Sequence, residues 1–116
     1  QVAACLHEDF DAKGVYLYEL ARRGEHFGSA LLKKLEKIIP RHRGRVDGRE
    51  SRDGVMRRTR GLKKIVEEIG GMPEAGYLFL NHARTALTFE TPSEYSLYRR
   101  VQCHVRFLNG VADIGR

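Results

Sequence analysis

Short apolar runs typical of β-strands alternate with helical patterns along this chain, and this alternation limits the folds open to it. The runs cover residues 2–6, 15–20, 76–80 and 85–89, and each is rich in β-branched, aromatic or aliphatic side chains. Strands that interleave with helices favour an architecture in which helices cover a sheet. We therefore predict an α/β fold.

Two amphipathic segments separate these runs. The first is a helical pattern that ends at Pro40, because proline cannot continue a helix. Its apolar residues are Leu31, Leu32, Leu35, Ile38 and Ile39. The second covers residues 59–69 and is followed by Gly70 and Gly71, a common helix end. Both segments are predicted to be helices.

A third helix has the clearest start signal. Thr91, Pro92 and Glu94 fall at the N-cap, first and third positions of a capping box. An apolar stripe then follows, formed by Tyr98, Val101, Val105 and Leu108. Gly110 is a typical stop signal, so we predict a helix over residues 92–109.

Positive charge is concentrated in one segment. Residues 41–60 hold eight arginines against three acidic residues, which gives 8 − 3 = +5 of the chain's formal charge of +6. The same segment has three glycines and few apolar residues, so we predict an exposed loop over about residues 41–58. Such a loop, from Arg41 to Arg60, is also the basis of an alternative function, a nucleic-acid-binding module. It lacks aromatic residues that would stack on bases, and a solvated loop is an equally good interpretation.

A length of 116 residues supports a single domain. Cys5 and Cys103 are too few for a disulfide framework and are interpreted as small buried side chains. No apolar stretch reaches the length of a membrane span, so we expect a soluble chain of unknown compartment, with the cytoplasm favoured. The first residue is Gln1, which implies upstream polypeptide that was cut off, processed or not observed.

Two candidate site residues lie where a strand run ends. His7 follows the first run and Glu90 follows the last. Ligands bind beyond the carboxyl ends of strands in open α/β sheets, so both would face one cleft if their strands are parallel and close. His7 could then be a metal ligand or acid–base group, and Glu90 a general base. A hydrogen-bonded strand-end histidine and a carboxylate at a helix start are the plainer interpretations.

The segments around these two residues, Leu6 to Glu19 in sequence and Ala86 to Ser93, together resemble the zinc carboxypeptidase family. Its relatives include the succinylglutamate desuccinylase and aspartoacylase group. The resemblance implies the C-terminal half of that fold, with a partial mixed sheet of about four strands. It also implies that His7 is the third zinc ligand and that Glu90 is the base activating a zinc-bound water. Full-length relatives hydrolyse amide bonds, so a peptide or N-acyl amino acid is the implied substrate.

The chain departs from this family in the first two zinc ligands, which come from a His-x-x-Glu motif. No histidine of the chain is followed by glutamate three residues later. The residues at that position after the five histidines are Phe10, Ser29, Arg45, Thr85 and Phe107. A catalytic zinc needs about three protein ligands, which His7 alone does not supply. Nearby Glu8, Asp9 and Asp11 could add oxygen ligands, although such acidic runs are usually solvated. The family's substrate-binding arginine has no counterpart in this chain either.

The departure predicts a partial domain that is inactive alone, so whether the chain is an enzyme stays uncertain. In the carboxypeptidase interpretation the arginine segment could border the cleft and favour an acidic substrate, with Arg57, Arg58 and Arg60 as candidate binding residues. A half-domain would also expose a sheet edge and apolar surface. We therefore expect a homo-oligomer, and a self-associating, non-enzymatic module is a third hypothesis.

Overall fold

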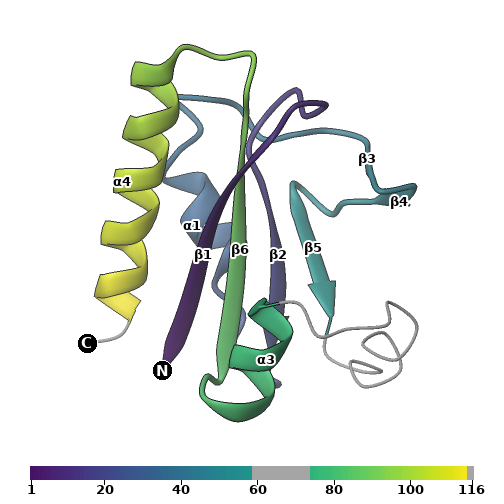
Figure 1. The fold of residues 1–116 in the computed structure, drawn as a ribbon, viewed down its shortest axis with the longest axis vertical. Coiled ribbons are helices and arrows are strands. Elements are labelled where there is room, and N and C mark those ends of the chain that lie inside the picture. The colour runs from purple at the N-terminus through teal and green to yellow at the C-terminus, as the bar shows by residue number, and fades with distance from the viewer. Residues whose placement is uncertain (59–73, 115–116) are drawn as a thin grey trace.

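The computed structural model describes residues 1–58 and 74–114, and it contains a sheet flanked by helices (Figure 1). The elements are β1 (Val2–Asp9), β2 (Tyr16–Ala21), α1 (Gly28–Lys33), β3 (Arg45–Val46), β4 (Arg49–Glu50), β5 (Val55–Arg58), α3 (Glu74–Asn81), β6 (Thr85–Pro92) and α4 (Leu97–Ile114). Four strands form a mixed sheet in the order β1-β6-β2-β5, and β3 and β4 form a separate hairpin. The predicted α/β class and four-stranded mixed sheet are confirmed.

Helices α1 and α4 cover one face of this sheet, here called the helix face (Figure 1). Alternation along β2 and the residue before it explains how the face forms. Val15 and Leu17 belong to the core under the helices, while Tyr16 and Tyr18 belong to the cluster on the opposite side. Phe89 from β6 stacks on Phe107 from α4 with 4.4 Å between ring centroids. The core is therefore built between the sheet and the two helices.

The opposite face, here called the front face, is only partly covered. Helix α3 packs on it against β6, β1 and β2, and Figure 1 shows α3 near the end where β1 begins. The β3–β4 hairpin adds Val46 to a small buried cluster with Ala12, Tyr16 and Met56. The other end of the front face, where β1 and β6 end, carries His7 and Glu90.

Two elements differ from the sequence prediction in type. Residues 76–80 lie in helix α3, so the predicted strand is wrong. A short apolar run has no period that distinguishes a strand from a helix, and packing on the sheet decides it here. Residues 41–58 were predicted to be a loop, but they contain the short strands β3, β4 and β5. The few apolar residues of this segment, Val46, Val55 and Met56, are buried and hold it against the rest of the fold.

Helix α4 is displaced from its predicted bounds at both ends. Strand β6 continues through Pro92, so the predicted capping box is wrong, and Ser96 caps the helix by accepting a hydrogen bond from the Arg99 amide at 3.3 Å. At the far end the helix continues past Gly110, where an added Cβ would lie 2.6 Å from Leu31 Cδ2. That glycine allows close packing of α4 on α1 and does not end the helix.

Helix α1 is shorter than predicted and ends at Lys33, with turns continuing towards Pro40. The predicted apolar residues still reach the core, and Leu31, Leu32, Leu35 and Ile39 are buried. The helix predicted over residues 59–69 lies outside the described residues.

Both cysteines are buried and free, as predicted. Within residues 1–58 and 74–114, every helix is too short or too polar to cross a membrane.

Candidate active site

Three adjacent strands place His7, Glu90 and Tyr16 in one row across the front face. Strands β1 and β6 are parallel, and His7 lies opposite Glu90 in their register. Strand β2 runs antiparallel to β6 with Tyr16 opposite Glu90. The carboxyl ends of β1 and β6 therefore lie side by side. The sequence analysis expected His7 and Glu90 to come together if their strands were parallel and close, and both conditions hold.

His7 and Glu90 differ sharply in their exposure to solvent. The side chain of His7 is 54% exposed, whereas that of Glu90 is only 10% exposed. Their closest polar atoms, His7 Nδ1 and Glu90 Oε2, are 3.9 Å apart. The pair thus combines an accessible imidazole with a carboxyl that is largely removed from water.

The environment of Glu90 favours its protonated form. Burial, followed by the charges of Asp9 and Asp47, raises the pKa of Glu90 to about 7. A carboxyl that titrates near neutral pH can both accept and donate a proton under ordinary conditions. Such a shift is typical of groups that transfer protons in enzymes.

Two tyrosines fix the carboxylates that surround Glu90. The Tyr16 hydroxyl donates to Asp9 Oδ2 at 2.5 Å, and this bond lowers the pKa of Asp9. The Tyr18 hydroxyl donates to Asp47 Oδ2, also at 2.5 Å. Burial and these bonds raise the pKa of both tyrosines, so they remain protonated donors. Asp9 is thus held ionised while Glu90 tends to keep its proton.

Asp47 comes from the tip of the β3–β4 hairpin, far from Glu90 in sequence. Its φ of 50° lies in the left-handed region, which aspartate tolerates better than most residues. The hairpin thereby brings a carboxylate over the front face. Sequence analysis missed Asp47, Tyr16 and Tyr18 because their relevance depends on strand register and on this turn.

The acidic residues near His7 separate in the structure. Glu8 points to the helix face, where it pairs with Arg100 of α4. Asp9 accepts the Asp11 amide at 2.8 Å as well as the Tyr16 hydroxyl. Among Glu8, Asp9 and Asp11, Asp9 is therefore the residue that contacts the row of His7, Glu90 and Tyr16, through its hydrogen bond with Tyr16.

The candidate substrate-binding arginines are not brought to this row. Arg57 lies on β5 and donates to Glu19 Oε1 at 3.1 Å, and Glu19 faces away from Tyr16 and Tyr18 along β2. Arg58 is the last residue of β5 and only its backbone is described, while Arg60 lies outside the described residues. The substrate roles of these three arginines stay predictions.

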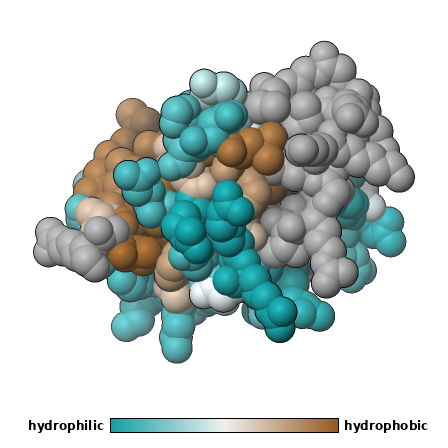
Figure 2. Space-filling model, turned by 90° about the horizontal axis from the view of Figure 1, so that it is seen from below, coloured by the Kyte–Doolittle hydropathy of each residue, from teal (hydrophilic) through white to brown (hydrophobic). Residues whose placement is uncertain are grey.

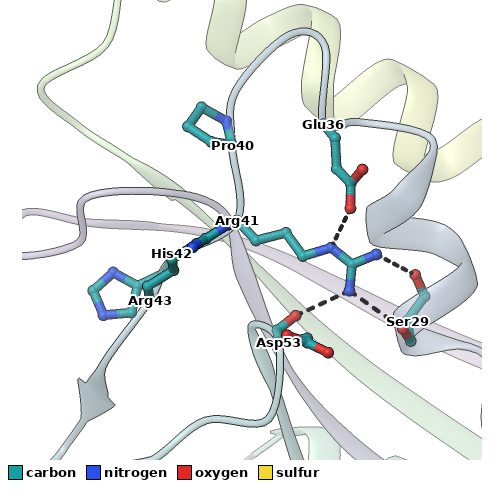
Figure 3. Close-up of a pocket in the computed structure, with 7 residues that line it drawn as sticks. All are labelled: Ser29, Glu36, Pro40, Arg41, His42, Arg43 and Asp53. Atoms are coloured by element: carbon teal, nitrogen blue, oxygen red, sulfur yellow. Dashed lines mark hydrogen bonds and ion pairs between the residues drawn. The ribbon is translucent and has the colours of Figure 1, made fainter.

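Arg41, at the start of the arginine segment, serves an internal role (Figure 3). Its guanidinium donates to Glu36 Oε1 at 2.7 Å, to Ser29 Oγ and carbonyl, and to the Asp53 carbonyl. These groups line a pocket of about 430 Å³ with Pro40, His42 and Arg43. Arg41 and Arg57 are therefore used to hold the fold, which leaves fewer arginines for phosphate contacts.

The resemblance to zinc carboxypeptidases implies a metal, and the described residues fit it only in part. His7 offers an accessible imidazole, the usual kind of zinc ligand. However, no group of three or more His, Cys, Asp or Glu side chains suited to a metal ion occurs in the part of the chain that the structure describes. These residues alone do not form a zinc site.

Comparison with known proteins identifies solved structures that share this fold. No family model and no curated protein matches the chain. Three of the matching structures are of proteins from Shewanella species, each named a "putative metallopeptidase". The one from Shewanella amazonensis SB2B has a TM-score of 0.79 and 20% identity, over 98% of this chain and 40% of its own.

Two further matches agree with the first. The Shewanella denitrificans OS217 protein has a TM-score of 0.72 and 21% identity, over 92% of this chain and 38% of its own. The Shewanella baltica OS155 protein has a TM-score of 0.71 and 18% identity, over 93% of this chain and 38% of its own. The chain thus has the fold of a minor part of these proteins and spans well under half of their length.

Proposed function

We propose that this chain contributes one metal ligand, His7, and the proton-transferring carboxyl, Glu90, to a zinc-dependent hydrolase of the carboxypeptidase or deacylase type. The observation that carries the proposal is the row in which an accessible imidazole lies 3.9 Å from a buried carboxyl. The raised pKa of that carboxyl and the fold shared with proteins named metallopeptidases support it. The remaining ligands would come from polypeptide outside the described residues.

In this proposal Glu90 accepts a proton from the attacking water and passes it to the leaving amine of an amide bond. Both steps need a carboxyl that titrates near the working pH, and a pKa of about 7 meets that need. His7 does not take part in proton transfer, because its role is to hold the metal. The chain alone would be inactive, since one imidazole does not make a catalytic zinc site.

The substrate class in this proposal is a peptide or an N-acyl amino acid. The charges of Asp9 and Asp47 both raise the pKa of Glu90, so the surroundings of Glu90 are acidic. Arg57 points to the other side of the sheet. In this proposal the cation that binds a substrate carboxylate is therefore a residue other than Arg57.

The test is amide hydrolysis by the full-length gene product that contains this chain, assayed with zinc on peptides and N-acyl amino acids. Glu90→Gln should lower kcat by about 10²-fold or more, which is the usual contribution of a general base. Glu94→Gln is the matched control, because Glu94 is exposed and its ion pair among the described residues is with Lys13 at the surface. His7→Ala should lower the zinc content as well as the activity, whereas His82→Ala should change neither.

Two results would contradict the proposal. One is a wild-type protein that binds zinc yet hydrolyses no amide in the panel. The other is a Glu90→Gln variant whose kcat stays within a few-fold of the wild-type value.

A further inference from the structure

His104 of α4 is a partly buried histidine to which the proposed function gives no role. Its ring meets the ring of Phe89 edge-on, with 5.2 Å between the centroids. Its surroundings are apolar, and in Figure 2 hydrophobic residues gather on the side where α4 and β1 lie in Figure 1. The Nδ1 atom of His104 is buried and has no hydrogen-bond partner within residues 1–58 and 74–114. A buried ring nitrogen of this kind is uncommon and calls for an explanation.

Thr91 connects this histidine to the candidate site. It follows Glu90 directly on β6, so its side chain points to the helix face, where it is fully buried. The hydroxyl oxygen of Thr91 lies 2.9 Å from Nε2 of His104. The same oxygen lies 3.5 Å from the backbone carbonyl oxygen of His7. His104 therefore reaches the backbone of His7 through a single hydroxyl group, from behind the sheet.

The single proton of this hydroxyl indicates the tautomer of His104. A carbonyl oxygen can only accept, so a hydrogen bond to His7 requires the proton of the Thr91 hydroxyl. That arrangement needs a proton on Nε2, which donates to Thr91, and it leaves Nδ1 as an unpaired acceptor. The reverse arrangement loses the bond to His7 and places an unpaired N–H at the buried Nδ1. Unpaired buried N–H groups are rarer than unpaired acceptors, so the first arrangement is favoured.

The environment of the ring agrees with a single proton. Burial lowers the pKa of His104, while the nearby charge of Glu8 opposes this shift and that of Arg100 adds to it. The imidazole is therefore neutral at neutral pH, with one N–H and one lone pair.

The connection acts at the end of β1 that carries His7. Strand β1 has one neighbour, β6, among the described strands, so His7 has strand pairing on one side. Helix α4 holds this end from behind at two places, through the ion pair of Arg100 with Glu8 and through the contact of His104 with Thr91. The second contact joins the backbone of His7 to the residue that follows Glu90.

We propose that His104 is a positioning residue of the candidate site. Its Nε2–H donates to the Thr91 hydroxyl, and the Thr91 hydroxyl donates to the His7 carbonyl. These two bonds hold the backbone of His7 opposite Glu90. The order of the bonds rests on the contacts of His104 and Thr91 alone, while their effect on catalysis rests also on the proposed function.

Nitrogen-15 NMR of the histidine rings in this chain tests the order of the bonds without an activity measurement. At neutral pH we expect one tautomer of His104, with its proton on Nε2. Thr91→Val removes the hydroxyl and should shift the carbonyl carbon resonance of His7, whereas Thr91→Ser keeps the hydroxyl and should leave that resonance near its wild-type position. Thr85→Val should not move it. This variant is the matched control, because Thr85 is also a buried β6 threonine whose hydroxyl donates to a backbone carbonyl, that of Glu25.

Rescue by a conservative variant separates positioning from packing in the full-length gene product. His104→Leu fills the space without a donor, and we expect it to lower kcat for amide hydrolysis by about tenfold or more. Its KM should stay within about twofold of the wild-type value, because substrate binding is not the step affected. His104→Gln should recover most of the lost kcat, since its side-chain amide can donate to Thr91. Thr85→Val should leave kcat unchanged.

A proton on Nδ1 of His104, or a charged ring at neutral pH, would overturn the order of the bonds. So would a His7 carbonyl resonance that responds equally to Thr91→Val and Thr85→Val. Equal kcat values in His104→Leu and His104→Gln would overturn the positioning role. An Nε2 proton and the expected His7 shifts in a protein that hydrolyses no amide would uphold the bonds from His104 to His7 and refute the proposed function instead.

Discussion

The carboxyl of Glu90 is stabilised in its protonated form in the folded chain, which links stability to pH. Its pKa rises from the ordinary 4.5 to about 7 on folding, so the folded state binds the proton more tightly than the unfolded state. Stability from this group is complete below pH 4.5 and is lost as the pH rises through 7. The loss amounts to roughly 3 kcal/mol by pH 8, because each pH unit between the unfolded and folded pKa values corresponds to about 1.4 kcal/mol.

Glu90→Gln should remove this dependence, because glutamine is neutral at every pH. We expect the variant to be more stable than the wild type at pH 8, by up to about 3 kcal/mol, and similar at pH 5. Urea unfolding at both pH values, with a chelator present, measures it. Glu94→Gln is the control, and equal changes between pH 5 and 8 in wild type and Glu90→Gln would contradict the expected linkage.

The charge of Asp47 is one of the two that raise the pKa of Glu90. Asp47→Asn removes that charge, while the amide oxygen can still accept the Tyr18 hydroxyl and asparagine tolerates a φ of 50°. We expect the pKa of Glu90 to fall, as followed by carboxyl carbon NMR titration. Asp53→Asn is the matched control, because Asp53 also has a positive φ but belongs to a different turn. An unchanged Glu90 pKa in Asp47→Asn would show that the hairpin does not act on the site.

The start of α1 depends on a carboxylate from β2. Glu19 is fully buried and accepts the Phe27 and Gly28 amides at 2.7 and 2.6 Å, while Arg57 donates to its other oxygen. Glu19→Ala should therefore cost about 3–5 kcal/mol, because helix amides and a cation lose their partner. Chemical denaturation measures it, with Glu25→Ala as a surface-pair control of about 1 kcal/mol or less. A loss at Glu19 no larger than at Glu25 would refute this account of α1.

The elements that the sequence predicted well are those in which local pattern and packing agree. Strands β1, β2 and β6 were predicted within a few residues because their apolar runs are dense. Residues 76–80 were misassigned because a short apolar run does not specify a period, and β5 was missed among arginines. The predicted start of α4 was wrong because Thr91 and Pro92 pair in strand β6. Strand pairing therefore excludes the capping box that the sequence indicated at Thr91.

Only the site residues at the ends of apolar strand runs could be predicted from the sequence. His7 and Glu90 could be identified as strand ends, and the register places them opposite each other. Tyr16, Tyr18 and Asp47 depend on contacts between elements far apart in sequence, which local pattern does not encode. The same holds for the outward stripe of α4, since helical spacing does not reveal which side meets the core.

The four strands should differ in protection because of their places in the whole sheet. Strand β6 lies between β1 and β2, so both of its sides are paired, whereas β1 has one neighbour, β6, among the described strands. In hydrogen exchange of this chain by NMR, we expect protection at the amides of β6 from Ala86 to Thr91 and only at alternate amides of β1. The two classes of β1 amide should differ in protection by at least about tenfold. Uniform protection of β1 at low concentration would mean that its outer side is already paired within the chain. Uniform protection only at high concentration would mean pairing between copies, and alternating protection throughout would leave the β1 edge available to another segment.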